Sequence, residues 1–154
     1  MILDMNAEGG FPIIKILHII ISISFLVIAI WLFFRSYKGI FKAQPFIHLD
    51  KLLSFGFIIS LYLQLIFGLI LFSNLGSESG FNYLSAERSM TIVSKRLWPI
   101  EHIVLMLFSL FIANLGLIIS LNTKSDRRKY INLISYFSIS VSLIIFSLCA
   151  IYLF

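Results

Sequence analysis

The chain has 154 residues, of which 60% are hydrophobic and only 12% are charged. A soluble domain of this size could not hide so much apolar surface, because polar residues normally cover the outside of such a domain. The excess of Lys and Arg gives a formal net charge of +5, but these residues lie in short segments beside apolar runs. This arrangement indicates membrane topology and not a nucleic-acid-binding surface. We therefore predict an integral membrane protein.

Apolar runs predict membrane-spanning helices at about 12–34, 52–72, 98–121 and 130–154. Each run has about 20 residues or more, enough to cross a hydrocarbon core of ~30 Å at ~1.5 Å per residue. The first run is longer than a signal-peptide core and follows Asp4 and Glu8, so we expect it to stay in the membrane. The expected fold is all-α: a single domain over residues 1–154, forming an up-down-up-down four-helix bundle.

Basic residues set the expected orientation of these helices. They gather between the first and second runs and between the third and fourth, at Arg35, Lys38, Lys42, Lys51, Lys124, Arg127, Arg128 and Lys129. The positive-inside rule then places both termini on the non-cytoplasmic side. The segment 127–129 is most simply a topology anchor, with a site for anionic lipid as the alternative.

The long connection at 73–97 predicts a turn at 76–80 and a short interfacial helix at 83–92, and nothing in it suggests catalysis. The single cysteine, Cys149, excludes an internal disulfide and disfavours a cysteine-based zinc site. No charged residue occupies the middle of a run, which argues against an ion pump. A transporter or an enzyme is therefore the weakest of the function classes considered.

Two histidines lie near the starts of alternate runs: His18 in the first and His102 in the third. In an up-down-up-down bundle these starts share one side of the membrane, so both imidazoles fall at a similar depth. Two axial ligands of one haem iron require this arrangement. Hydrogen bonding to a neighbouring helix is the simpler alternative for either histidine alone. No third metal ligand is evident at that level except Glu101.

Helical periodicity predicts which residues share a face with each histidine and could contact a bound haem. Ser22, Phe25 and Ala29 share a face with His18, and the His102 face carries Met106, Ser109, Ala113 and Gly116. Small residues on such faces let helices approach closely or leave room for a flat macrocycle. Lys15 and Arg96 lie near the same boundary, where they would either meet haem propionates or extend to the lipid interface.

Other polar residues have more ordinary expected roles. Glu101 would complement the helix dipole from the first turn of the third helix, and His48 would be an interfacial or capping residue. Tyr62 and Gln64 would hydrogen-bond to another helix, with a quinone or haem-edge contact as the alternative. Close helix packing would explain the serines of the last run, at Ser135, Ser138, Ser140, Ser142 and Ser147.

The segment Arg96-Leu-Trp-Pro-Ile-Glu101-His102, the run from Gln64 to Gly68 and the position of His18 resemble a family of small bacterial four-helix membrane proteins labelled cytochrome B-like. The resemblance implies one b-type haem and electron transfer in the bacterial inner membrane. Members of that family often carry a histidine in the second span where this chain has Tyr62.

The sequence thus favours an electron-transfer protein over a stand-alone enzyme. It would bind one haem b near the outer face, with His18 and His102 as iron ligands, and exchange electrons with a membrane donor such as quinol. The alternative is a cofactor-free accessory subunit that packs against a larger membrane complex.

Overall fold

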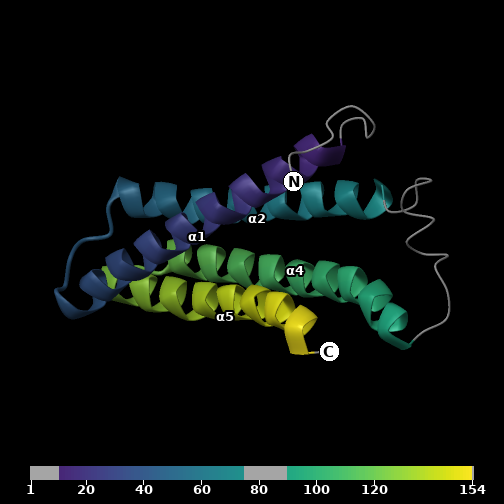
Figure 1. Cartoon of the computed structure of the whole chain (residues 1–154). Helices are drawn as coiled ribbons and strands as arrows, with labels where there is room; N and C mark the ends of the chain where they lie inside the picture. The colour runs from purple at the N-terminus through teal and green to yellow at the C-terminus, as the bar shows by residue number, and fades with distance from the viewer. Residues whose placement is uncertain (1–10, 75–89, 154) are drawn as a thin grey trace.

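The structure, a computed structural model, describes residues 11–74 and 90–153, and the side chains of 13–73 and 100–149. These ranges are all-helical and contain α1 (Phe11–Phe41), α2 (His48–Asn74), α4 (Met90–Asn122) and α5 (Asp126–Leu153) (Figure 1). Each is long and apolar enough to cross a membrane, over Ile13–Phe41, His48–Ser73, Ile100–Asn122 and Asp126–Cys149. The predicted turn at 76–80 and most of the predicted helix at 83–92 lie outside the described residues.

The helices extend beyond the predicted apolar runs. α1 continues through Arg35 and Lys38 to Phe41. α4 begins at Met90, so Pro99 and Glu101 lie inside the helix. An apolar run measures what lipid covers, whereas a helix continues into the polar interface wherever its residues favour that state. The placement of Glu101 in a first helical turn was therefore wrong.

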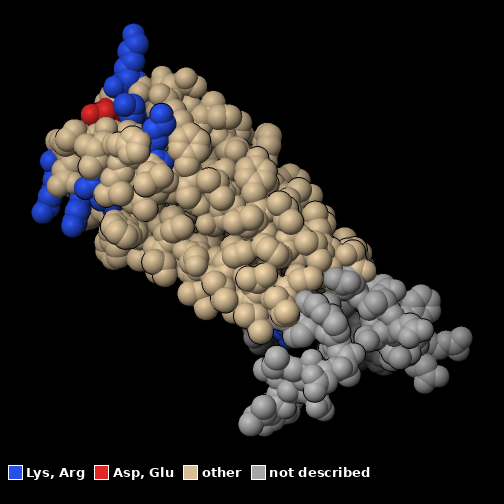
Figure 2. All heavy atoms as spheres, turned by 90° about the horizontal axis from the view of Figure 1, so that it is seen from above, with Lys and Arg blue, Asp and Glu red and all other residues tan. Residues whose placement is uncertain are grey.

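The helices pack in neighbouring pairs. α1 packs against α2 and α5, and α4 packs against α5 and α2. The α1–α2 connection meets the start of α5, because the Tyr130 hydroxyl donates a hydrogen bond to the Pro45 carbonyl (3.0 Å). Figure 2 shows Lys and Arg gathered at this end of the molecule, beside a broad band free of charged side chains. We refer to this end as the basic end.

A buried carboxylate joins three elements at the basic end. Asp50 of α2 is 2% exposed and accepts two hydrogen bonds from Arg35 of α1, at 2.7 and 2.9 Å. It also accepts a hydrogen bond from the Tyr130 hydroxyl of α5 (2.7 Å). The Ile47 amide donates to the same carboxylate (2.9 Å), which caps the start of α2 as an acidic third helical residue can. One side chain thus fixes the relative positions of α1, α2 and α5.

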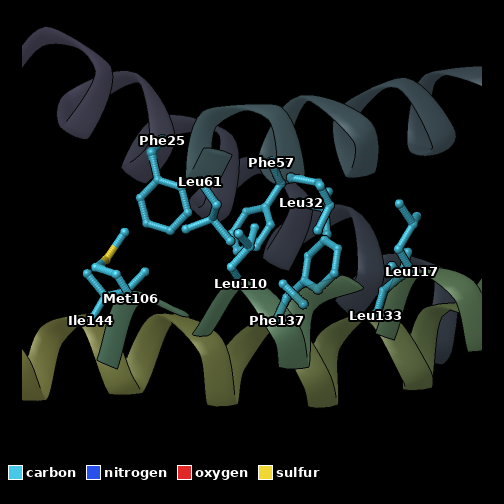
Figure 3. Packing of buried hydrophobic residues seen from close by; sticks show 12 residues of the cluster. Phe25, Leu32, Phe57, Leu61, Met106, Leu110, Leu117, Leu133, Phe137 and Ile144 are labelled. Atoms are coloured by element: carbon cyan, nitrogen blue, oxygen red, sulfur yellow. The ribbon is translucent and has the colours of Figure 1, made fainter. Parts of the chain in front are cut away.

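The core lies where apolar side chains from all of the described helices converge (Figure 3). At its centre the ring of Phe57 stacks on that of Phe137, with centroids 4.2 Å apart and planes at 11°. Phe25 packs against the other side of Phe57 at 4.9 Å. In lipid the attraction between helices comes mainly from such close packing, because lipid tails are as apolar as the core.

Two helical glycines lead to opposite predictions. A Cβ added at Gly116 of α4 would collide with the Tyr136 side chain of α5, whereas one at Gly56 would make only ordinary contact with Ile28 (3.8 Å). We expect Gly116→Ala to lower the free energy of unfolding by about 1–3 kcal/mol through overpacking. Gly56→Ala should raise it by about 0.5–1 kcal/mol through helix propensity.

Reversible unfolding in mixed detergent micelles measures both glycine variants under the same conditions. Equal effects of the two substitutions would contradict the close approach of α4 to α5 at Gly116.

Candidate functional site: a histidine-lined cavity

His18 and His102 line the same cavity, which has a volume of about 130 Å³. They come from α1 and α4, which are not among the closely packed helix pairs. The cavity therefore lies between helices on opposite sides of the assembly, with α2 and α5 supplying the remaining walls. Its lining is mostly apolar and consists of His18, Ser22, Phe25, Leu26, Leu61, Gln64, His102, Met106, Val141, Ile144, Ile145 and Leu148.

His102 is oriented by a hydroxyl group of α5. Its Nδ1 lies 2.7 Å from the Oγ of Ser147, a residue that is itself buried. A hydrogen bond at one ring nitrogen limits rotation of the ring and so sets the direction in which the other nitrogen points. Ser147 thus holds the imidazole in one orientation within the cavity.

The imidazole of His18 has one buried nitrogen, Nδ1, without a hydrogen-bond partner among the described residues. Its Cε1 lies 3.7 Å from the position that a Cβ on Gly68 of α2 would occupy, so the glycine leaves space beside the ring. Buried polar atoms in proteins usually have a partner. The Nδ1 of His18 is thus an exception among the buried polar atoms of the described residues.

Gln64 links α2 to α1 at the cavity through hydrogen bonds. Its Nε2 donates a hydrogen bond to the Ser22 Oγ (2.7 Å), and that hydroxyl donates to the carbonyl of His18 (2.8 Å). The expectation that Gln64 bonds to another helix is confirmed. This chain of bonds links α2 to the turn of α1 that carries His18.

The structure brings together five of the predicted site residues: His18, Ser22, Phe25, His102 and Met106 all line the cavity. Ser109 does not; its hydroxyl instead meets the Oγ of Ser140 (2.6 Å) and the Ser140 carbonyl (3.0 Å). Lys15 is exposed and is not part of the lining. The side chain of Arg96 lies outside the described side chains.

Some of the predictions for the other polar residues are confirmed and others are wrong. Tyr62 is 46% exposed and has no hydrogen bond within the described residues, so the expected bond to another helix is wrong. Ser140 and Ser147 pack against α4 as predicted, but Ser135, Ser138 and Ser142 are exposed. His48 is exposed at the first position of α2, in keeping with an interfacial role.

Sequence reasoning missed the wall that α5 supplies. Val141, Ile144, Ile145 and Leu148 line the cavity, but each is an ordinary apolar residue in an apolar run. The only signal available was spacing, because residues three and four apart share a helix face. That spacing gives no indication of which neighbouring helix the face meets.

The described residues contain no group of three or more His, Cys, Asp or Glu side chains that could hold a metal ion. A chelating site of the zinc type is therefore not formed by them, because such sites use three or four protein ligands. The cavity therefore provides two imidazoles between apolar walls.

Comparisons with protein-family models, with curated proteins and with solved structures found no match.

Proposed function

We propose that the protein is a cytochrome b-like electron-transfer protein of the bacterial inner membrane, with His18 and His102 as axial ligands of one haem b. In this proposal the helices form an up-down-up-down bundle with both termini on the non-cytoplasmic side. The observation that carries the proposal is that histidines from two separate helices line one cavity. Bis-imidazole ligation needs two such residues and no third ligand.

The two imidazoles are suitable axial ligands for a haem, but the cavity in this conformation is too small to hold one. The cavity of about 130 Å³ is well below the roughly 300–1,000 Å³ of typical cofactor sites. Leu26, Val141 and Ile145 separate it from a larger groove between α1 and α5, since these three residues line both spaces. Haem binding therefore requires those side chains to move aside.

A bound haem would supply one-electron transfer, and the chain's own residues would position and shield it. Ser147 would orient the imidazole of His102, and Gln64 would fix the turn of α1 that carries His18. The apolar walls would exclude water and so influence the potential. A quinol in the membrane is the proposed electron donor, with an acceptor on the outer side.

A reduced-minus-oxidised visible spectrum of the purified protein, reconstituted with haem, tests this proposal. We expect a b-type spectrum that His18→Ala and His102→Ala each reduce at least ten-fold in amplitude. His48→Ala is the matched control, because His48 is exposed and lies on another helix, and it should leave the spectrum unchanged. A spectrum that survives both cavity substitutions, or no spectrum in the wild-type protein, would refute the proposal.

A second candidate is a cofactor-free accessory subunit of a larger membrane complex. The small cavity and the bond between His102 and Ser147 favour it, because both are consistent with a purely structural histidine. Purification in a mild detergent distinguishes the candidates. Recovery within a larger, haem-free assembly would support the accessory subunit.

A further inference from the structure

An apolar groove of about 580 Å³ lies between α1 and α5. Its α1 wall runs from Leu26 to Phe34, and its α5 wall runs from Ile134 to Ile145. Its only polar lining residues are Ser138 and Ser142, whose small side chains leave the space between the larger walls open. The volume falls within the range of roughly 300–1,000 Å³ that small-molecule sites occupy.

The length of the groove matches one leaflet of a bilayer. At ~1.5 Å per residue its walls extend over about 12 Å on α1 and about 17 Å on α5. Half of a ~30 Å hydrocarbon core is about 15 Å. The length of the groove therefore suits an acyl chain of one leaflet.

Unpaired cations lie beyond one end of the groove. At the basic end the acidic groups are already engaged, Asp50 by Arg35 and Asp126 by Lys129. The exposed cations there that have no ion-pair partner among the described residues are Lys38, Lys42, Lys51, Lys124, Arg127 and Arg128. This end therefore complements a negatively charged group.

Helix periodicity aligns one of these cations with the groove. Arg127 precedes Ile134 by seven residues, two helical turns, and so lies on the same face of α5. Lys38 follows Phe34 by four residues and extends the α1 wall in the same direction. Basic pockets between membrane helices on the cytoplasmic side are known to receive the head groups of anionic lipids.

We propose that the groove between α1 and α5 binds one anionic phospholipid. An acyl chain lies between the two helices, and the phosphate contacts Arg127 with support from Lys38. Groove length, volume and charge all favour this occupant. The site goes beyond the proposed haem function and does not depend on it, because none of its cations lines the histidine cavity.

Native mass spectrometry of the detergent-purified, haem-free protein tests the lipid site. The protein is incubated with phosphatidylglycerol or with phosphatidylcholine of the same chain length. We expect several-fold more retained phosphatidylglycerol. Arg127→Gln should reduce its retention about five-fold, the effect of losing one cation near a lipid surface at ~1 kcal/mol. Lys51→Gln is the control, because Lys51 lies on α2, outside the groove.

A second pair of variants tests the groove itself. Ser142→Phe places a ring in the groove and should abolish the preference for phosphatidylglycerol. Ile139→Phe adds a ring on an exposed part of α5 outside the groove and should leave the preference intact. Equal retention of the two lipids, or an unchanged preference in Ser142→Phe, would overturn the proposal. So would a change in oligomer mass without lipid loss, which would make the groove an interface between copies.

Discussion

Replacing Asp50 with alanine is expected to lower the free energy of unfolding by about 3–5 kcal/mol, the range for breaking a buried ion pair. The carboxylate is 2% exposed and its partner Arg35 is 22% exposed. The substitution leaves the guanidinium of Arg35 without its counter-ion and removes one of the two acceptors of the Tyr130 hydroxyl. The cost comes mainly from the unpaired charge of a guanidinium that is only partly exposed to solvent.

Three further variants separate the contributions at this site. Tyr130→Phe removes the hydroxyl contacts to the Asp50 carboxylate and to the Pro45 carbonyl but leaves the ion pair intact, and it should cost about 1.5–3 kcal/mol. Asp126→Ala removes a carboxylate that is 43% exposed and pairs with Lys129, so it should cost much less than Asp50→Ala. Arg35→Met combined with Asp50→Leu removes both charges and should recover much of the loss. Equal losses of unfolding free energy for Asp50→Ala and Asp126→Ala would contradict a larger contribution from the Arg35–Asp50 pair than from the exposed pair of Asp126 and Lys129.

Replacing Phe57 with alanine should cost about 3–5 kcal/mol, as for large aromatic side chains in well-packed cores. Phe57 is fully buried and lies between the rings of Phe25 and Phe137. Since lipid is as apolar as the core, the loss reflects the missing contacts and the void, and not transfer from water. The void would also enlarge the groove, because Phe57 lines it.

Phe146→Ala is the matched control for Phe57→Ala. Phe146 is 60% exposed on α5 and in a membrane would face lipid, so its loss should change the free energy of unfolding by less than about 0.5 kcal/mol. Unfolding of both variants in the same detergent provides the comparison. Similar costs at the two positions would contradict the central place of the aromatic stack.

The helical spans were predictable from sequence because the physical signal was strong and one-dimensional. A run of some 20 apolar residues has few alternatives to a membrane helix. The shared cavity of His18 and His102 was also predictable in outline, because alternate helices of such a protein place their starts at one level. The outcome for Ser109 shows the limit of this reasoning. It does share a face with His102, but α5 comes close enough there to engage its hydroxyl through Ser140.

The buried pair of Asp50 and Arg35 was not anticipated. By sequence each residue is an interfacial charge, and Arg35 had been assigned to membrane topology alone. What could have suggested the pair is an acidic residue near a helix start, one loop away from a cation at the preceding helix end. The contribution of Tyr130 could not have been found in this way, because it lies 80 positions along the chain from Asp50. Only tertiary packing brings them together.

The hydrogen bonds between helices divide the described helices into two pairs, here called arms, which are joined by further hydrogen bonds at the basic end. α1 and α2 form one arm, joined by Gln64 and Arg35, and α4 and α5 form the other, joined through the bonds of Ser109 and His102. The Tyr130 hydroxyl connects the two arms at the basic end through its hydrogen bonds to Asp50 and to the Pro45 carbonyl. At the far end each arm carries one histidine, and the cavity between them is lined mostly by apolar side chains. Slight opening about Tyr130 would separate the two imidazoles and widen the space between them while leaving the pivot intact.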